Sequence, residues 1–163
     1  MRPTWDEYFI LQALLVSSRA TCSRLKVGAV ITRNNHTIAT GYNGSLQGDK
    51  HCIDDGCLVE DGHCIRTIHA ETNAILQCAK SGAKTTGATI YVTHFPCQNC
   101  VKKIIQADIS VIKYYHDYGK SSNYTKEMLK AHDIQCISLN TPKTTERINK
   151  LLLETITELQ DIE

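Results

Sequence analysis

Two short stretches of this chain carry the residue types that could do chemistry. Residues 69–71 read His-Ala-Glu, and residues 96–100 read Pro-Cys-Gln-Asn-Cys. One imidazole and two thiolates offer zinc three ligands, which leaves its fourth position open to water. Glu71 stands two residues after His69, so it can lie beside such a metal without binding it and can move protons there. The spacing therefore predicts a catalytic zinc site at His69, Cys97 and Cys100, with Glu71 as its proton-transfer group.

Two helices must bring these residues together. A helical run covers residues 70–80 and stops at Ser81-Gly82, and a second helix is expected from about residue 97 to 107. Pro96 suits the start of the second helix, because proline fixes φ where no backbone donor is needed. A C-x-x-C pair by itself also fits a redox pair or a structural zinc knuckle. Its conjunction with His-x-Glu favours the catalytic site.

Length and charge limit the possible partners. The chain has 163 residues and a net charge of +1, without a dense basic block. We expect one domain over residues 1–163 that binds no long nucleic acid, because a polymer needs many phosphate contacts. A mononucleotide needs only a few cations. No signal peptide or membrane-length apolar run is found, and the cysteines cluster with histidines, so a reducing cytoplasmic location is predicted.

A second group of cysteines lies in the long segment 45–67. This segment has little apolar periodicity, so ordering it would cost much entropy unless something ties it down. A structural zinc ion with four ligands would do so. The alternative is a flexible lid with reduced, unliganded thiols. The simplest set of ligands is Cys22, Cys52, Cys57 and Cys64, with His51 and His63 as substitutes.

The order of expected elements predicts an α/β fold. A helix capped by Thr4 over residues 5–20 precedes a hairpin at 27–42, in which Asn35 is expected at positive φ. From residue 69 on, helices and strands alternate through short connections, which favours parallel pairing of the later strands. These elements are the helix 70–80, strand 88–94, helix 97–107, strand 109–115, helix 124–132, strand 134–139 and helix 142–159. The fold expected is a mixed-sheet α/β domain.

Residues 41–44 read Gly-Tyr-Asn-Gly and follow the hairpin. They fit an ordinary glycine-rich turn. They also fit a ligand-contacting loop in which the Asn43 amide bonds a sugar hydroxyl or a base.

The chain resembles the cytidine and deoxycytidylate deaminase superfamily over nearly its whole length. His-x-Glu with Pro-Cys-x-x-Cys is specific for the superfamily. The Gly-Tyr-Asn-Gly loop, together with Thr-Ile-His-Ala-Glu, points to the deoxycytidylate (dCMP) deaminases, which include a bacterial branch named for a late-competence operon. The resemblance implies a three-layer α/β/α fold with a central mixed five-stranded sheet. Other matching stretches are residues 18–22, 26–30, 87–89 and 91–93.

By that resemblance, the reaction is hydrolytic deamination of dCMP to dUMP and ammonia, which supplies dUMP for thymidylate synthesis. Zinc-bound hydroxide would attack C4 of cytosine, while Glu71 protonates N3 and then helps ammonia leave. Asn43 and Ala70 would contact the substrate. Its phosphate would lie near Arg24, Lys26 and Tyr118.

The resemblance also implies regulation and assembly. Such enzymes are often hexamers, activated by dCTP and inhibited by dTTP with Mg²⁺. The corresponding regulatory residues here are Tyr42, Asn43, Gly44 and Lys80. Lys80 stands where the regulated enzymes have arginine. A lysine ammonium cannot donate the two parallel hydrogen bonds of a guanidinium, which weakens the expectation of regulation. Relatives with a second zinc use cysteines that match Cys22 and Cys52.

Two other classes of function remain open. One is a deaminase for cytidine, guanine, a riboflavin precursor or a tRNA adenosine, the last of which should carry a broad basic surface. The other is a non-enzymatic, zinc-stabilised accessory protein for competence. A purely structural metal site has no need of a carboxylate at the position of Glu71.

Overall fold

The fold is organised around one five-stranded sheet with the order β2-β1-β7-β8-β9. The computed structural model describes residues 1–117 and 123–160. The hairpin strands β1 and β2 are antiparallel, β1 pairs antiparallel with β7, and β7, β8 and β9 run parallel. The sheet is therefore mixed, with the expected parallel later strands. Its strands are β1 (Gly28–Arg33), β2 (His36–Tyr42), β7 (Thr89–His94), β8 (Val111–His116) and β9 (Gln135–Ser138).

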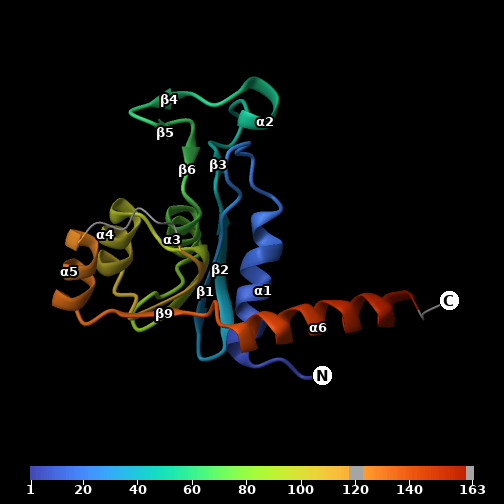
Figure 1. Ribbon diagram of the computed structural model, residues 1–163. Coiled ribbons are helices and arrows are strands. Elements are labelled where there is room, and N and C mark those ends of the chain that lie inside the picture. Colours follow the sequence, from blue (N-terminus) through green and yellow to red (C-terminus); the bar gives the residue numbers. More distant parts are fainter. Residues whose placement is uncertain (118–122, 161–163) are drawn as a thin grey trace.

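Helices cover both faces of this sheet, which confirms the predicted three layers (Figure 1). On one face, a buried cluster joins the sheet to α3 and α4 and includes Leu129 of α5. On the other face, Phe9 and Ile10 of α1 and Ile148 of α6 pack against Val30 and Tyr91. The helices are α1 (Trp5–Ser17), α3 (Ala70–Ser81), α4 (Gln98–Gln106), α5 (Asn123–Ala131) and α6 (Pro142–Gln160).

Local sequence signals account for several element ends. Thr4 forms the expected capping box with Glu7 at the start of α1. Asn34 and Asn35 both have positive φ in the tight hairpin turn, where asparagine tolerates the left-handed region. The predicted helix 5–20 is too long, because α1 ends at Ser17 and the hydroxyls of Ser17 and Ser18 bond carbonyls of its last turn.

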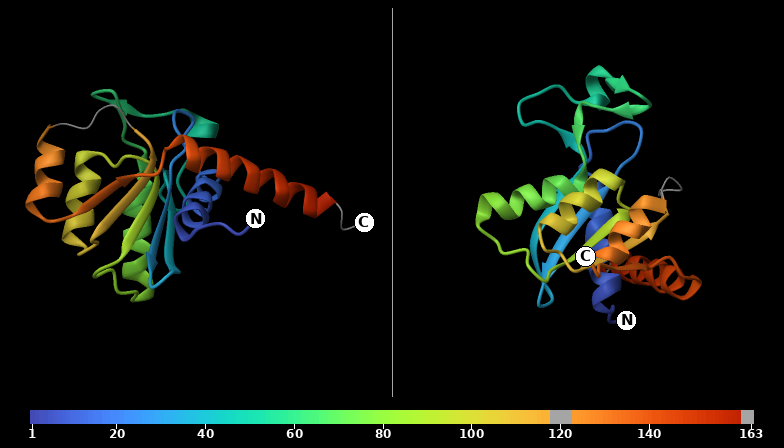
Figure 2. Two further views of the ribbon diagram at one scale, coloured as in Figure 1. Left: turned by 60° about the horizontal axis from the view of Figure 1, so that its bottom comes forward. Right: turned by 90° about the vertical axis from the view of Figure 1, so that its left-hand side faces the viewer.

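The segment 45–67 is more ordered than its sequence suggests. Its elements α2, β4 and β5 lie together at one end of the molecule, and β3 and β6 connect them to the rest (Figures 1 and 2). The sequence shows no periodicity here because each of these elements is too short for a helical or an alternating hydrophobic pattern to repeat. These elements are β3 (Gly44–Ser45), α2 (Cys52–Asp55), β4 (Val59–Glu60), β5 (His63–Cys64) and β6 (Thr67–Ile68).

An ion pair joins α6 to α1. The Arg147 guanidinium donates to both carboxylate oxygens of Glu7, whose side chain is 5% exposed. The hydrogen bond from Arg147 lowers the pKa of Glu7 to about 2.

No helix within the described ranges is long and apolar enough to cross a membrane.

Arg147→Gln is therefore expected to lower the melting temperature at pH 7. Because folding depresses the pKa of Glu7, the pair stabilises the protein above about pH 4.5 and loses its effect as the pH falls through about 2. Thermal unfolding of variant and wild type should converge over this pH window. Lys143→Gln, which removes the same charge from an exposed position on α6, is the matched control. Equal melting temperatures at pH 7 would contradict the role of this pair.

Candidate active site

The first predicted metal group lies at the start of two helices. His69 is the N-cap residue of α3 and Cys97 is the N-cap residue of α4. Cys100 follows in the first turn of α4, and Glu71 in the first turn of α3. The positive ends of both helix dipoles thus favour the thiolates and the carboxylate at this position.

The ligand atoms of this group are spaced as zinc requires. Nδ1 of His69 lies 3.5 Å from Sγ of Cys97 and 3.4 Å from Sγ of Cys100. All three ligand atoms lie within 4.8 Å of one another. Two ligands of one tetrahedral zinc ion, one nitrogen and one sulfur, should be about 3.6 Å apart, given the usual bond lengths. The residues therefore fit a zinc ion with three protein ligands.

The two thiols of this group shift each other's pKa in opposite directions. A hydrogen bond from Cys100 lowers the pKa of Cys97, with a further contribution from His69. The same bond raises the pKa of Cys100. Binding of a divalent cation requires both sulfurs as thiolates and therefore releases protons.

Glu71 is the acidic group of this site. It is 4% exposed, and burial raises its pKa. A buried carboxyl group with a raised pKa accepts a proton more readily than an exposed one and can pass it on. Glu71 nevertheless lines the open cavity, so it can reach a bound ligand.

Thr72 and Lys103 support the metal group in a way that the sequence analysis missed. The ammonium of Lys103 donates to the Thr72 hydroxyl at 3.0 Å, and that hydroxyl lies 3.8 Å from Sγ of Cys100. With Lys103 as its donor, the hydroxyl can direct its own proton to the Cys100 sulfur. Such outer contacts orient metal ligands.

A cavity of about 830 Å³ opens over the metal group. Arg24, Asn43 and Ala70 line it, as do His63 and His94. Lys26 is exposed and does not line it. Tyr118 lies outside the described residues. The remaining lining residues are Cys22, Leu25, Val27, Gly62, Cys64, Thr67, His69, Glu71, Phe95, Cys97, Gln98 and Asn99.

Asn43 holds the loop opposite the metal group. Its Oδ1 accepts from the backbone N–H of Val27 at 2.8 Å, and its Nδ2 donates to the carbonyl of Leu25 at 2.7 Å. Asn73 of α3 donates to the Tyr42 carbonyl at 2.7 Å and anchors the same loop. That Asn43 contacts a sugar stays a prediction. The second hydrogen of its Nδ2 and the second lone pair of its Oδ1 could make that contact.

Of the four residues predicted to bind a regulatory nucleotide, Asn43 lines the active-site cavity, whereas the other three do not. Tyr42 is half-buried, Gly44 is buried and Lys80 is exposed in the last turn of α3. None of these three is among the described residues that line the cavity. Their role remains a prediction about a surface apart from the metal group.

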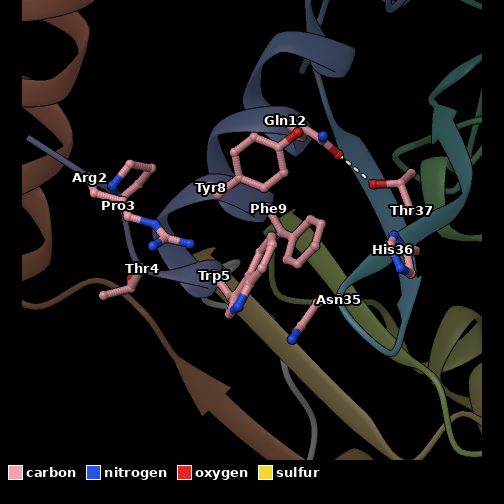
Figure 3. A pocket seen from close by; sticks show the side chains of 10 residues that line it. All are labelled: Arg2, Pro3, Thr4, Trp5, Tyr8, Phe9, Gln12, Asn35, His36 and Thr37. Atoms are coloured by element: carbon pink, nitrogen blue, oxygen red, sulfur yellow. Dashed lines mark hydrogen bonds between the residues drawn. The ribbon is translucent and has the colours of Figure 1, made fainter.

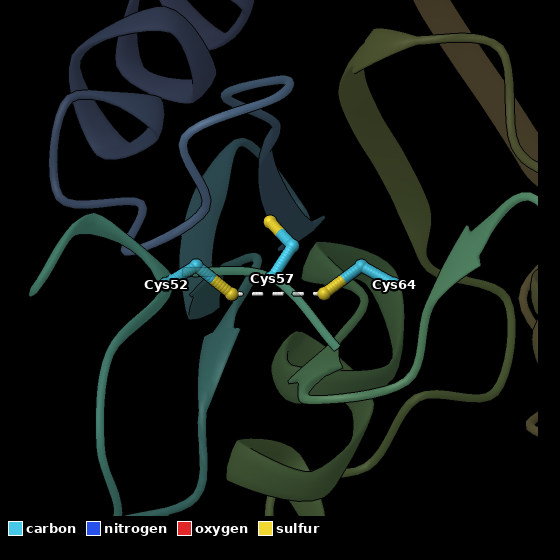
Figure 4. A group of neighbouring side chains, drawn as sticks. All are labelled: Cys52, Cys57 and Cys64. Atoms are coloured by element: carbon cyan, nitrogen blue, oxygen red, sulfur yellow. Dashed lines mark hydrogen bonds between the residues drawn. The ribbon is translucent and has the colours of Figure 1, made fainter. Parts of the chain in front are cut away.

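The second group brings together three of the four predicted cysteines. The sulfur atoms of Cys52, Cys57 and Cys64 lie within 4.8 Å of one another, and those of Cys52 and Cys64 face each other (Figure 4). Those of Cys52 and Cys64 are 3.6 Å apart, close to the spacing of about 3.8 Å expected for two thiolates on one tetrahedral zinc. Cys22 is buried but does not belong to this group, and neither do His51 and His63.

The protonation of this group also suits a metal. Burial raises the pKa of Cys52 to about 12. Burial acts in the same direction on Cys64, but hydrogen bonds from the backbone of Arg66 and from Cys52 outweigh it and lower the pKa of Cys64 to about 7. Cys64 therefore becomes a thiolate more readily than Cys52.

Cys57→Ser and Cys64→Ser are each expected to reduce the zinc content by one equivalent per chain. Serine keeps the size of the side chain but removes the sulfur ligand. Elemental analysis of purified protein measures the change. Cys136→Ser, at an exposed position on β9 outside both groups, is the control and should keep all its zinc. Unchanged zinc in both test variants would show that the second site is wrong.

A separate hollow of about 770 Å³ lies between α1 and the β1–β2 turn (Figure 3). Trp5 stacks on Phe9 there, and the Thr37 hydroxyl donates to the Gln12 side chain at 2.8 Å. The described residues that line this hollow include one histidine, His36, but no cysteine and no carboxylate. It therefore lacks the groups that make the first cavity reactive.

Known proteins match both the sequence and this fold. The family described as "Cytidine and deoxycytidylate deaminase zinc-binding region" matches residues 3–116. ComE operon protein 2 of Bacillus subtilis is 55% identical over 127 residues, which cover 78% of this chain and 67% of that protein. The deoxycytidylate deaminase of Saccharomyces cerevisiae is 40% identical over 124 residues, or 72% of this chain and 39% of the yeast protein.

A solved structure shows the same architecture. The dCMP deaminase of cyanophage S-TIM5, in complex with dCMP and dUMP, aligns with a TM-score of 0.73 and 31% identity. The alignment covers 85% of this chain and 98% of the phage chain. This chain therefore belongs to the zinc-dependent cytidine and deoxycytidylate deaminase family, as its motifs predict.

Proposed function

We propose that this protein is a dCMP deaminase, which hydrolyses dCMP to dUMP and ammonia. The observation that carries the proposal is the convergence of His69, Cys97 and Cys100 beside the buried Glu71. A structural zinc site has no need of a carboxylate in the same cavity, whereas hydrolysis of an amidine requires a group that moves protons.

The residues of this chain divide the chemistry between them. His69, Cys97 and Cys100 would hold the zinc, which, when bound, acts as a Lewis acid and acidifies water. Glu71 takes a proton from the attacking water and delivers it to N3 of the cytosine. It then takes the proton of the new hydroxyl on C4 and delivers it to the amine, which departs as ammonia and leaves the C4 carbonyl of dUMP. Burial of Glu71 supports this role, because its raised pKa lets it alternate between both protonation states.

A mononucleotide is the substrate that the cavity suits best. Its volume of about 830 Å³ lies in the range of small-molecule sites. Arg24 supplies a permanent positive charge on its wall, and the net charge of +1 argues against a nucleic-acid polymer. The phage relative bound to dCMP and dUMP supports the same substrate.

The assay that tests this proposal compares ammonia release from dCMP, dCTP, CMP, cytidine and a tRNA anticodon stem. We expect turnover of dCMP at the highest kcat/KM. Preference for cytidine would overturn the substrate, and activity only on the tRNA would assign the protein to the editing enzymes. Absence of turnover on every substrate by the zinc-loaded protein would favour the accessory role in competence.

The resemblance supports further proposals about the whole protein. We propose that residues 1–163 act as one domain, that the protein is a cytoplasmic homohexamer, and that dCTP activates it while dTTP with Mg²⁺ inhibits it. Light scattering tests the hexamer. Turnover of dCMP with each added nucleotide tests the regulation.

A further inference from the structure

Two histidines stand side by side at the carboxyl ends of parallel strands β7 and β8. The ring centroids of His94 and His116 are 4.9 Å apart, and the two residues are register partners. His94 lines the active-site cavity. In α/β sheets, ligands bind outside the carboxyl ends of the strands, so His94 holds a position where a substrate would lie.

A chain of hydrogen bonds fixes which nitrogen of His94 carries the proton. The backbone N–H of Gly28 donates to the Thr93 hydroxyl at 3.2 Å, and this hydroxyl lies 3.0 Å from Nδ1 of His94. Thr93 is 3% exposed, so its own proton needs an acceptor within the protein. Nδ1 of His94 is that acceptor. The proton of the neutral ring is therefore on Nε2.

The Nε2–H donor of His94 is left for a ligand. Across residues 1–117 and 123–160, Thr93 is the one hydrogen-bond partner of the His94 ring. His94 lines the cavity, where a bound ligand can meet its ring. Burial lowers the pKa of His94, and the nearby His116 adds to this effect, so the ring stays neutral at pH 7.

We propose that the Nε2–H of His94 donates a hydrogen bond to the phosphate of the bound nucleotide and so selects a monophosphate over a nucleoside. This inference rests on the proposed function. A phosphate offers several strong acceptor oxygens and needs more donors than one cation supplies. Arg24 already gives one N–H to the Gly62 carbonyl at 3.1 Å. Among the described lining residues, Glu71 is the one carboxylate, and it belongs with the base and the metal.

The test measures binding of the products dUMP and deoxyuridine to the zinc-loaded full chain by calorimetry, so that turnover does not interfere. His94→Leu removes the donor and is expected to weaken dUMP binding about 10- to 100-fold, as for a lost hydrogen bond to a charged group. Deoxyuridine binding should stay unchanged. His94→Gln places an amide N–H near the position of Nε2 and is expected to restore most of the affinity for dUMP.

A measurement on the wild-type protein covers the case in which His94→Leu does not fold. In imidazole nitrogen NMR spectra, His94 should show the Nε2–H tautomer, and dUMP should shift this signal while deoxyuridine does not.

Equal losses for dUMP and deoxyuridine in His94→Leu, an unchanged affinity for both, or a Nδ1–H tautomer would each overturn the inference. If the wild type turns over dCMP, these results leave the proposed function intact. If the wild type binds neither dCMP nor dUMP, the proposed function fails as well.

Discussion

Glu71→Gln is expected to abolish the turnover of dCMP while the protein keeps its zinc. Glutamine has nearly the same shape but cannot accept a proton, and a general acid–base group contributes about 10²- to 10⁴-fold to the rate. Glu71 is not one of the three converging ligands, so the metal should remain bound. The measurement is ammonia release from dCMP together with elemental analysis of the same preparation.

The control for this variant is Glu127→Gln, an exposed position on α5. It makes the same chemical change away from the cavity and should leave kcat and zinc content as in the wild type. Two results would contradict the role of Glu71. One is full activity of Glu71→Gln, and the other is loss of zinc in that variant, which would make Glu71 a ligand.

Gly41→Ala is expected to destabilise the protein by about 3 kcal/mol or more, at the upper end of overpacking costs. A Cβ at this position would lie closer than 3.0 Å to the carbonyl oxygen of Ala70 and the backbone nitrogen of Ala74. Both atoms belong to the backbone of α3, which cannot move aside locally. Because His69 caps α3 and Glu71 lies in its first turn, displacement of α3 should also lower zinc content and activity. Chemical denaturation and elemental analysis measure these effects.

Gly44→Ala, at the start of β3, is the matched control. The atoms nearest to a Cβ there belong to the side chains of Tyr42, at 3.1 Å, and Thr21, at 3.3 Å, which can adjust. A much smaller loss of stability is therefore expected. Equal losses in both variants would mean that the close approach of β2 to α3 is not what excludes a side chain at residue 41.

The metal-binding chemistry was readable from the sequence because its residues lie within short local patterns. His69 and Glu71 are two residues apart on one helix start, and Cys97 and Cys100 share one turn. Such spacings fix the geometry within each pair, and the conjunction of the two pairs, typical of the deaminase superfamily, predicted that they meet. The alternation of helices and strands after residue 69 likewise predicted the parallel part of the sheet.

Contacts between distant segments could not be read in the same way. Three of the four cysteines proposed for the second site converge, but Cys22 belongs to a segment whose placement depends on how it packs against α2. Lys26 has the charge expected of a phosphate ligand, yet its backbone places it outside the cavity lining. The role of Thr93 in fixing the His94 ring depends on Gly28, 65 residues away.

The most direct test of the account is the conversion of dCMP by one preparation with its zinc removed and then restored. A chelator strong enough to extract zinc should stop the release of ammonia. Added zinc should bring back dUMP and ammonia in equal amounts in the wild type, but not in Glu71→Gln. Deamination of dCMP at an undiminished rate by zinc-free protein would contradict the account.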